Sequence, residues 1–484
     1  MRELLVVLIG RVLAVAIALL GLRLSTTFLA PAEYGVLALL QTLQLLAIFF
    51  LTNPVVQYLN RKLHEWSAAG QLVHRLRLYL LYVNGCSLVA AAIAFAWQRR
   101  GDAAADALSF AVVFLGVLAL AWGPVISSFL NLLGNRIASI TLMTIAGLMG
   151  LGLATLLAWL SPGGLNWFAG LVIGNALAGL LAYRLLLANI PPLREESAPP
   201  PEERGEAVRF IVPLAVSAAF MWFLVTGYRL VFDLVWGAAL LGYAAVGLGV
   251  ATQLWAVSES LATQYLQPYL YRRMAEGQES GDRGACSDYV NVIGPLYLGF
   301  SALVAVNAPL AYGLLVAEGY HGGLMIFMVA IYVELLRVLT NAFCMPAHAS
   351  KDARLLIFSY LTAAVFVAAG LAVVAWLELG IIAGCLVLLS GGAVGFVSVV
   401  LRMRRLAPFL PDWRVWGAGV AVAVLGLGSA VAGLSGPVGL SWERALLAAL
   451  SGAAFLCYVR LVLTGNSSLQ RLFGSQLKEQ VIVE

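Results

Sequence analysis

Residues 107–132 read ALSFAVVFLGVLALAWGPVISSFLNL, and no residue among them is charged. A helix rises 1.5 Å per residue, so about 20 apolar residues cross the ~30 Å hydrocarbon layer of a membrane. Lipid offers no hydrogen-bond partner to the backbone, so such a segment must form a helix or belong to a closed barrel. The many Gly and Ala residues favour the helix. This stretch therefore predicts a transmembrane helix.

Similar stretches recur from one end of the chain to the other. Of its 484 residues 62% are hydrophobic and only 11% are charged, with a mean hydropathy of +0.93. Soluble domains are close to half apolar and a quarter charged. We therefore predict an all-α integral membrane protein with about fourteen transmembrane helices. The expected spans lie near 4–28, 35–58, 78–97, 107–132, 137–160, 165–187, 208–230, 238–266, 289–316, 323–346, 354–376, 379–401, 414–434 and 444–464.

The distribution of basic residues predicts the orientation. The apolar run that follows Arg2 continues past Leu20 without a cleavage site, so we expect it to be the first span. If the N-terminus is cytoplasmic, 22 of the 29 Lys and Arg residues fall in predicted cytoplasmic segments. This agrees with the positive-inside rule and places both termini in the cytoplasm. It also explains the net charge of +5 without a nucleic-acid partner.

One segment, 189–207, has the composition of a solvated linker, because it combines five prolines with several glutamates. It predicts two six-helix lobes, 1–188 and 208–401, followed by two additional helices and a cytoplasmic tail in 402–484. The two lobes resemble each other weakly. The sequences 21–24 (GLRL) and 227–230 (GYRL) end equivalent spans. Internal repeats of this kind are common in transporters, which hold substrate between the repeats.

Signatures of soluble enzymes are missing from the sequence. None of the three lysines follows a glycine, so the chain has no Walker A motif. The five cysteines show no CxxC spacing, and His64-Glu65 has no second histidine at zinc-binding distance. The predicted outer loops are too short to form a catalytic domain. We therefore expect no catalytic residue, no metal and no cofactor, and we do not expect an enzyme.

Five ionisable residues fall inside predicted spans, where a charge costs about 2.5–3.5 kcal/mol on insertion scales. They are Arg11, Arg23, Glu259, Glu334 and Arg337. Arg11 either snorkels to the interface or faces a cavity, and Arg23 is either an interfacial anchor or a cavity residue. Glu334 and Arg337 share a helix face and either neutralise each other or serve function. Glu259 has no partner on its own helix, so it needs a charge from another span, a proton or water.

Amide side chains form polar stripes on two equivalent spans. Gln41 and Gln44 lie on the second span, and Gln253 and Gln264 lie on the eighth. Such faces are unsuited to lipid. They indicate either hydrogen bonding between helices or a water-filled cavity, and the sequence supports both readings equally.

The run 26–38 (TTFLAPAEYGVLA) resembles the segment that joins the first two spans of polysaccharide-biosynthesis flippases. These flippases are the Wzx-type branch of the MATE-like multidrug/oligosaccharidyl-lipid/polysaccharide exporter superfamily. Arg229-Leu230, Gly242-Tyr243, Gln267-Pro268 and 133–136 (LGNR) are similar to further family motifs. The family often has an acidic residue before the arginine, where this chain has Tyr228, which puts ion coupling at that position in doubt.

The resemblance implies a two-lobed bundle in the bacterial inner membrane that alternates between inward and outward openings. Its substrate would be an undecaprenyl-pyrophosphate-linked oligosaccharide moved to the outer leaflet for surface polysaccharide synthesis. We expect Arg23 and Arg229, with Arg11 and Arg337, to attract the pyrophosphate, because arginine matches phosphate oxygens in charge and geometry. The glutamines would hydrate the sugars, and Glu259 or Glu334 would balance charge or couple protons.

Membrane lipid and the polymerase and glycosyltransferases of the same pathway are the expected partners, and an ion gradient is the expected driving force. Two other classes fit part of the pattern. A membrane polymerase or ligase should have a long outer loop or an acidic catalytic cluster. A MATE-like exporter of small cations should have an acidic rather than a basic cavity.

Overall fold

The computed structural model describes residues 2–98, 107–189, 201–276, 279–349, 354–406, 409–432, 438–465 and 468. All regular elements in these ranges are helices, and 13 segments are long and apolar enough to cross a membrane. One of them, Gly205–Thr263, has 59 residues and would measure about 90 Å as a single helix. Gly237 interrupts it with a non-helical backbone (φ 79°, ψ 168°), so it supplies two crossings. The predicted total of about fourteen spans is confirmed.

By contacts between residues the chain divides into two compact units, residues 1–245 and 246–484. The predicted linker, 189–207, falls partly on residues 190–200, which lie outside the described ranges. The rest is helical, because Pro201 begins α8 and proline is well suited to the first turn of a helix. The division into six-helix lobes stays a prediction.

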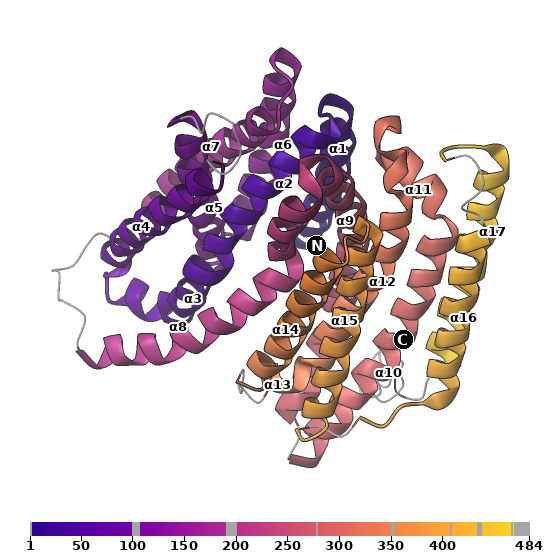
Figure 1. Cartoon of the computed structure of the whole chain (residues 1–484). Coiled ribbons are helices and arrows are strands. Elements are labelled where there is room, and N and C mark those ends of the chain that lie inside the picture. Colours follow the sequence, from indigo (N-terminus) through magenta and orange to yellow (C-terminus); the bar gives the residue numbers. More distant parts are fainter. Residues whose placement is uncertain are drawn as a thin grey trace. The chain divides into compact units, whose positions relative to one another are not determined.

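Unit 1 is a bundle of long helices, drawn from indigo to magenta in Figure 1. Glycines let its helices approach closely: a Cβ added to Gly170 or Gly174 of the seventh helix would overlap the backbone of the sixth at Ala154 or Gly150. Its elements are α1 Arg2–Phe28, α2 Pro31–Leu46, the π-helix η1 Ala47–Thr52, α3 Asn53–Ala68, α4 Leu72–Gln98, α5 Ala107–Leu132, α6 Arg136–Leu160, α7 Gly164–Asn189, α8 Pro201–Trp222, the π-helix η2 Phe223–Gly227 and the beginning of α9, Tyr228–Glu276.

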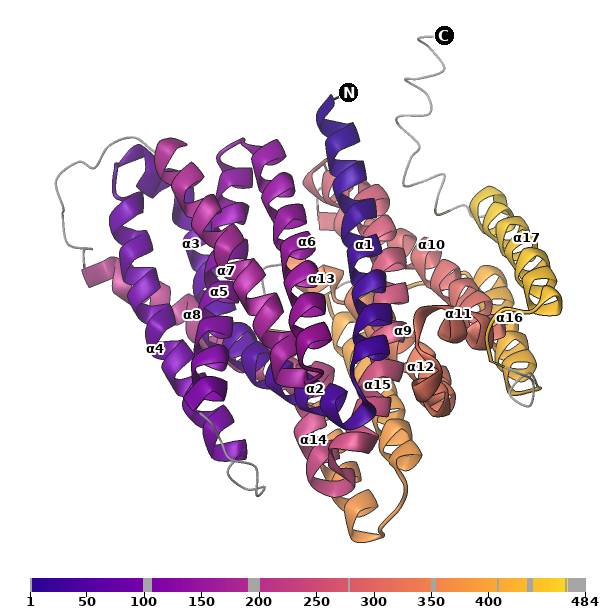
Figure 2. The same cartoon turned by 90° about the horizontal axis from the view of Figure 1, so that it is seen from above.

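Unit 2 contains the remainder of α9 and the helices that follow it. Its largest described core is built around Trp255 of α9, Tyr289 and Phe343. In both views α14 lies beside α15, and α16 lies beside α10 (Figures 1 and 2). The elements are α10 Glu279–Val306, α11 Ala308–Leu315, the 3₁₀-helix η3 Glu318–Gly323, α12 Leu324–Phe343, α13 Met345–Ala349, α14 Arg354–Trp376, α15 Ile381–Met403, α16 Trp413–Ala432 and α17 Trp442–Gly465.

The two π-helices have local causes and local partners. Pro54 follows η1 and lacks the N–H that a regular α-helix would use there. Within the same element the carbonyl of Leu51 accepts a hydrogen bond from the Tyr82 hydroxyl at 2.7 Å. In η2 a Cβ at Gly227 would meet the Trp222 ring, so glycine is needed at this position. Both elements therefore interrupt the α-helical hydrogen-bond pattern of unit 1 at defined places.

Candidate functional site

The segment between α1 and α2 fixes the packing of unit 1. Pro31 begins α2 in the first helical turn. Glu33 on that turn accepts a hydrogen bond from the backbone N–H of Gly164 at 2.8 Å, so its carboxylate caps the N-terminus of α7. A Cβ on Gly164 would overlap the Glu33 carbonyl, so the contact requires glycine. The acidic residue in this motif therefore has a structural partner.

Two glycines allow close contact between α2 and the second leg of α9, by which we mean the part of α9 that follows the break at Gly237. A Cβ on Gly35 would overlap the carbonyl of Ala238, and a Cβ on Gly242 would overlap the carbonyl of Pro31. The spacing is four residues on both helices, from 31 to 35 and from 238 to 242. Gly35 and Gly242, which belong to two of the motifs quoted from the sequence, thus form one reciprocal contact inside unit 1.

Arg229 is a partly buried cation at the start of α9. Its Nε is buried and has no hydrogen-bond partner among the described residues. Its guanidinium lies within electrostatic reach of Tyr34, whose hydroxyl interacts with Ser25 of α1. Arg23 is also partly buried, and its carbonyl accepts hydrogen bonds from Thr26 at 3.0 Å and Thr27 at 2.7 Å. Arg229 is therefore the predicted phosphate ligand with the clearest unused donor.

A further carboxylate, Asp233, is partly buried one helical turn after Arg229, and sequence reasoning missed it. Trp97 at the end of α4 donates its indole N–H to Asp233 at 3.4 Å. The expected seventh span ended at residue 230, so Asp233 was assigned to a loop. The sequence did contain one indication of its position, because a residue four after Arg229 lies on the same face of a helix.

Unit 2 holds a charged network between α9 and α12. Arg337 donates from Nε to Glu334 at 2.6 Å and from Nη1 to Glu259 at 3.1 Å. The side chains of Glu334 and Arg337 are 10% and 25% exposed, and that of Glu259 is 28% exposed. Glu259 thus finds its cation on another span, and Glu334 and Arg337 do pair on one face. Two carboxylates share one guanidinium, an arrangement that costs much less than isolated charges in a membrane.

Two neutral side chains complete the network. Asn341 donates to Glu259 at 2.7 Å, and Thr252 donates to Glu334 at 2.9 Å. Both were missed from the sequence, although the spacing contained the signal. Residues 334, 337 and 341 follow the i, i+3, i+7 pattern of one helix face, and 252 and 259 are separated by two turns. We call these five residues the Glu259–Arg337 network.

The remaining predicted site residues lie on different helices of the two units. Gln44 is buried and donates to the carbonyl of Gly116 on α5 at 2.7 Å, so it joins two helices. Gln41 and Gln253 are partly buried, and Arg11 is exposed on α1. The side chain of Gln264 lies outside what the structure describes.

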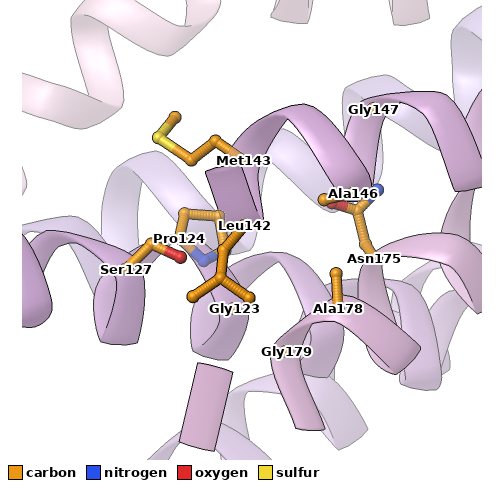
Figure 3. A pocket seen from close by; sticks show the side chains of 10 residues that line it. All are labelled: Gly123, Pro124, Ser127, Leu142, Met143, Ala146, Gly147, Asn175, Ala178 and Gly179. Atoms are coloured by element: carbon orange, nitrogen blue, oxygen red, sulfur yellow. The ribbon is translucent and has the colours of Figure 1, made fainter. Parts of the chain in front are cut away.

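Two pockets of the described part of the chain differ in character. A crevice of about 190 Å³ in unit 1 lies between α5, α6 and α7, as Figure 3 shows. Its polar side chains are Ser127 and Asn175, and no ionisable residue lines it, which makes it unsuited to a pyrophosphate. A second, mostly apolar groove of about 250 Å³ lies in unit 2 between α10, α16 and α17. Tyr458 borders this groove and donates to the carbonyl of Pro295 at 2.8 Å.

Comparisons with known proteins give a fold. No protein-family model matches the chain, and no curated protein matches it either. A solved structure described as "Lipid II flippase MurJ, inward closed conformation" superimposes with a TM-score of 0.68 at 10% identity, over 96% of this chain and 99% of that chain. A second, described as the inward-facing conformation of a multidrug resistance MATE family transporter of the MOP superfamily, gives a TM-score of 0.56 at 14% identity, over 81% and 94%. The chain has the fold of these membrane transporters.

That fold agrees with the expectation drawn from the motif at 26–38. It places this chain among multi-pass, all-helical membrane proteins and accounts for helices throughout the described ranges.

Proposed function

We propose that this protein is a flippase that moves an undecaprenyl-pyrophosphate-linked oligosaccharide from the cytoplasmic to the outer leaflet of the bacterial inner membrane. The observation that carries the proposal is the near-complete superposition on a structure described as a lipid II flippase. The unmatched 4% of this chain is about 20 residues, far fewer than the 44 residues of α16 and α17 together. The likeness therefore extends into the last two helices, whereas the multidrug transporter leaves 19% of this chain unmatched.

Arginines of unit 1 suit the pyrophosphate. A phosphate cannot enter the hydrocarbon layer without a compensating charge, and guanidinium donors match phosphate oxygens. Arg229 offers a buried Nε without a hydrogen-bond partner in the described chain, and Arg23 is the equivalent arginine of the first span. Arg11 is exposed on the same helix as Arg23. Arg337 already holds two carboxylates, so we assign it to the network rather than to the phosphate.

The apolar groove between α10, α16 and α17 suits the lipid tail. It has a volume of about 250 Å³ and is lined mainly by Gly, Ala, Val and Leu side chains. A polyprenyl chain needs apolar surface of this kind and gains little from polar groups. The two last helices would then have a function beyond filling the lipid-facing side.

The Glu259–Arg337 network is our candidate for ion coupling. It places two carboxylates around one arginine, so protonation of one carboxylate would leave a neutral pair. Substrate movement would be driven by an ion gradient, and no chemical step would be catalysed. Gln41 and Gln253 would contact the sugars.

The proposal can be tested with the purified protein in proteoliposomes that contain a fluorescent lipid-linked oligosaccharide. The measured quantity is the rate at which probe in the inner leaflet becomes accessible to an impermeant quencher. We expect Arg229→Ala and Arg23→Ala to slow this rate at least tenfold, and Arg229→Lys to retain part of it. In cells that lack the protein, unflipped precursor should accumulate at the cytoplasmic leaflet. Normal precursor export with altered sensitivity to cationic drugs would instead support an exporter, and outward-facing unpolymerised units would support a polymerase.

A further inference from the structure

We propose that unit 1 carries a binding site for an anionic membrane phospholipid, formed by α3, α4 and α8. The acyl chain would occupy an aromatic-lined pocket, and the phosphate would contact Arg75. The pocket has a volume of about 230 Å³ and is separate from the groove assigned to the polyprenyl tail. The inference therefore does not depend on the proposed function.

The walls of the pocket are apolar and aromatic. Tyr58 and Trp66 come from α3, Tyr79 and Tyr82 come from α4, and Ala207 comes from α8. These walls are fixed by local contacts. Tyr79 donates its hydroxyl to the carbonyl of residue 121 at 2.9 Å, and Tyr82 donates to that of residue 51 at 2.7 Å. Hydroxyls that already bond the backbone leave ring surface facing the pocket, which suits a hydrocarbon chain.

The pocket opens toward the lipid. Leu78 and Tyr82 line it on α4 and are 43% and 40% exposed, although α4 is a membrane-spanning helix. From Arg75 to Tyr82 the helix rises about 10 Å. A phospholipid held with its phosphate at Arg75 would therefore place the first part of one acyl chain beside Tyr82, inside the hydrocarbon layer.

Arg75 is held in place for contact with a headgroup. Its guanidinium carbon lies 4.9 Å from the centre of the Trp66 ring, and Nη2 is 3.5 Å from Gln71. Arginine stacked on an aromatic ring is orientated, and its five N–H donors can serve more than one acceptor. Trp and Arg together at a membrane–water interface are typical of headgroup contact.

The neighbouring charges favour an anionic lipid. Arg61 lies over the Phe210 ring at 4.9 Å, and Lys62 is 3.1 Å from Glu65 and 3.6 Å from Glu206. Cations outnumber carboxylates among the described residues here, because Arg209 is also exposed. The predicted orientation puts this end of the helices in the cytoplasm, where the negative leaflet surface attracts basic segments.

The experiment uses the full-length protein in detergent and measures lipid binding by native mass spectrometry. Phosphatidylglycerol and phosphatidylcholine with identical acyl chains are titrated against wild type, Arg75→Gln and Arg77→Gln. Arg77 is the matched control, because it is an exposed arginine of the same helix that does not line the pocket. We expect at least fivefold tighter binding of phosphatidylglycerol to wild type, loss of this preference in Arg75→Gln, and its retention in Arg77→Gln.

A second variant tests whether the acyl chain occupies the pocket. It keeps the proposal testable even if Arg75→Gln fails to fold. Ala207→Trp should fill the pocket and reduce the binding of both lipids at least fivefold. Excess inorganic phosphate should displace neither lipid from the wild-type protein. Equal binding of the two lipids to wild type would overturn the proposal. So would equal effects of the two arginine variants, or unchanged binding by Ala207→Trp.

Discussion

Arg337 of α12 and Glu259 of α9 are joined by a 3.1 Å ion pair between two membrane-spanning helices. The same guanidinium bonds Glu334 at 2.6 Å, and Asn341 donates to the other oxygen of the Glu259 carboxylate. Removing any of these four side chains takes a hydrogen-bond or ion-pair partner from at least one of the others. The network therefore joins α9 to α12 through balanced charges, and it is the group to which we assign ion coupling in the proposed function.

We predict that Arg337→Met destabilises the protein. Removing one partner of a buried ion pair costs about 3–5 kcal/mol, and the partial exposure of these side chains reduces our expectation to about 2 kcal/mol. Glu259→Gln keeps the shape and can still accept from Asn341, so its loss should be about half as large. Thermal unfolding in detergent measures both. Unchanged stability of Arg337→Met would contradict a structural role for the pairs.

Glu33→Ala should weaken the start of α7. The carboxylate accepts from the Gly164 N–H at 2.8 Å, and loss of a helix cap costs about 1 kcal/mol. Glu33→Gln retains an acceptor oxygen at this position, so its free energy of unfolding should fall by only about 0.3 kcal/mol. The two variants are compared by thermal unfolding. An equal loss in both would indicate that the charge, rather than the hydrogen bond, is what matters.

Gly35→Ala and Gly242→Ala should each separate α2 from the second leg of α9. The new methyl group would overlap the carbonyl of Ala238 or of Pro31, and backbone atoms cannot rotate away as side chains do. Gly249→Ala is the matched control, since a Cβ there meets nothing within 4 Å. We expect lower thermal stability and slower transport for the first two variants and little change for the control. A control that is as impaired as the variants would show that glycine is needed in α9 for another reason.

Gly237→Ala should cost about 1–3 kcal/mol, because φ 79° and ψ 168° lie in a region that is nearly exclusive to glycine. A Cβ at this position meets nothing within 4 Å, so the cost would be conformational and not steric. Unfolding measurements that show no loss would mean that the break is not maintained in solution.

The same break predicts a topology that can be measured. In a background without cysteine, a cysteine at Ala239 should react with an impermeant reagent added outside intact cells. A cysteine at Ala69 should react only after permeabilisation, because the predicted orientation puts it in the cytoplasm. Both side chains are exposed, so accessibility within the protein does not limit labelling. The reverse pattern would invert the orientation.

The sequence by itself determined the class of protein and the number of its spans. Long uncharged stretches such as 107–132 form transmembrane helices, because lipid offers no hydrogen-bond partners to backbone N–H and C=O groups. The sequence also showed that Glu259 needed a partner from elsewhere, since no opposite charge lies within four residues on its helix. Composition and helical spacing are local properties, so they can be read without a structure.

Only the tertiary structure decided which partners meet. Periodicity fixes the face on which Glu259 lies but cannot say that this face packs against 334–341, because that depends on long-range helix packing. For the same reason the sequence could not decide whether Gln44 faces a cavity or, as the structure has it, donates a hydrogen bond to Gly116 of another helix. Asp233 was not predicted as a site residue because hydropathy placed the end of the span at residue 230. In the structure the helix continues to the break at Gly237. Contacts between distant segments arise from packing geometry, which one sequence does not contain.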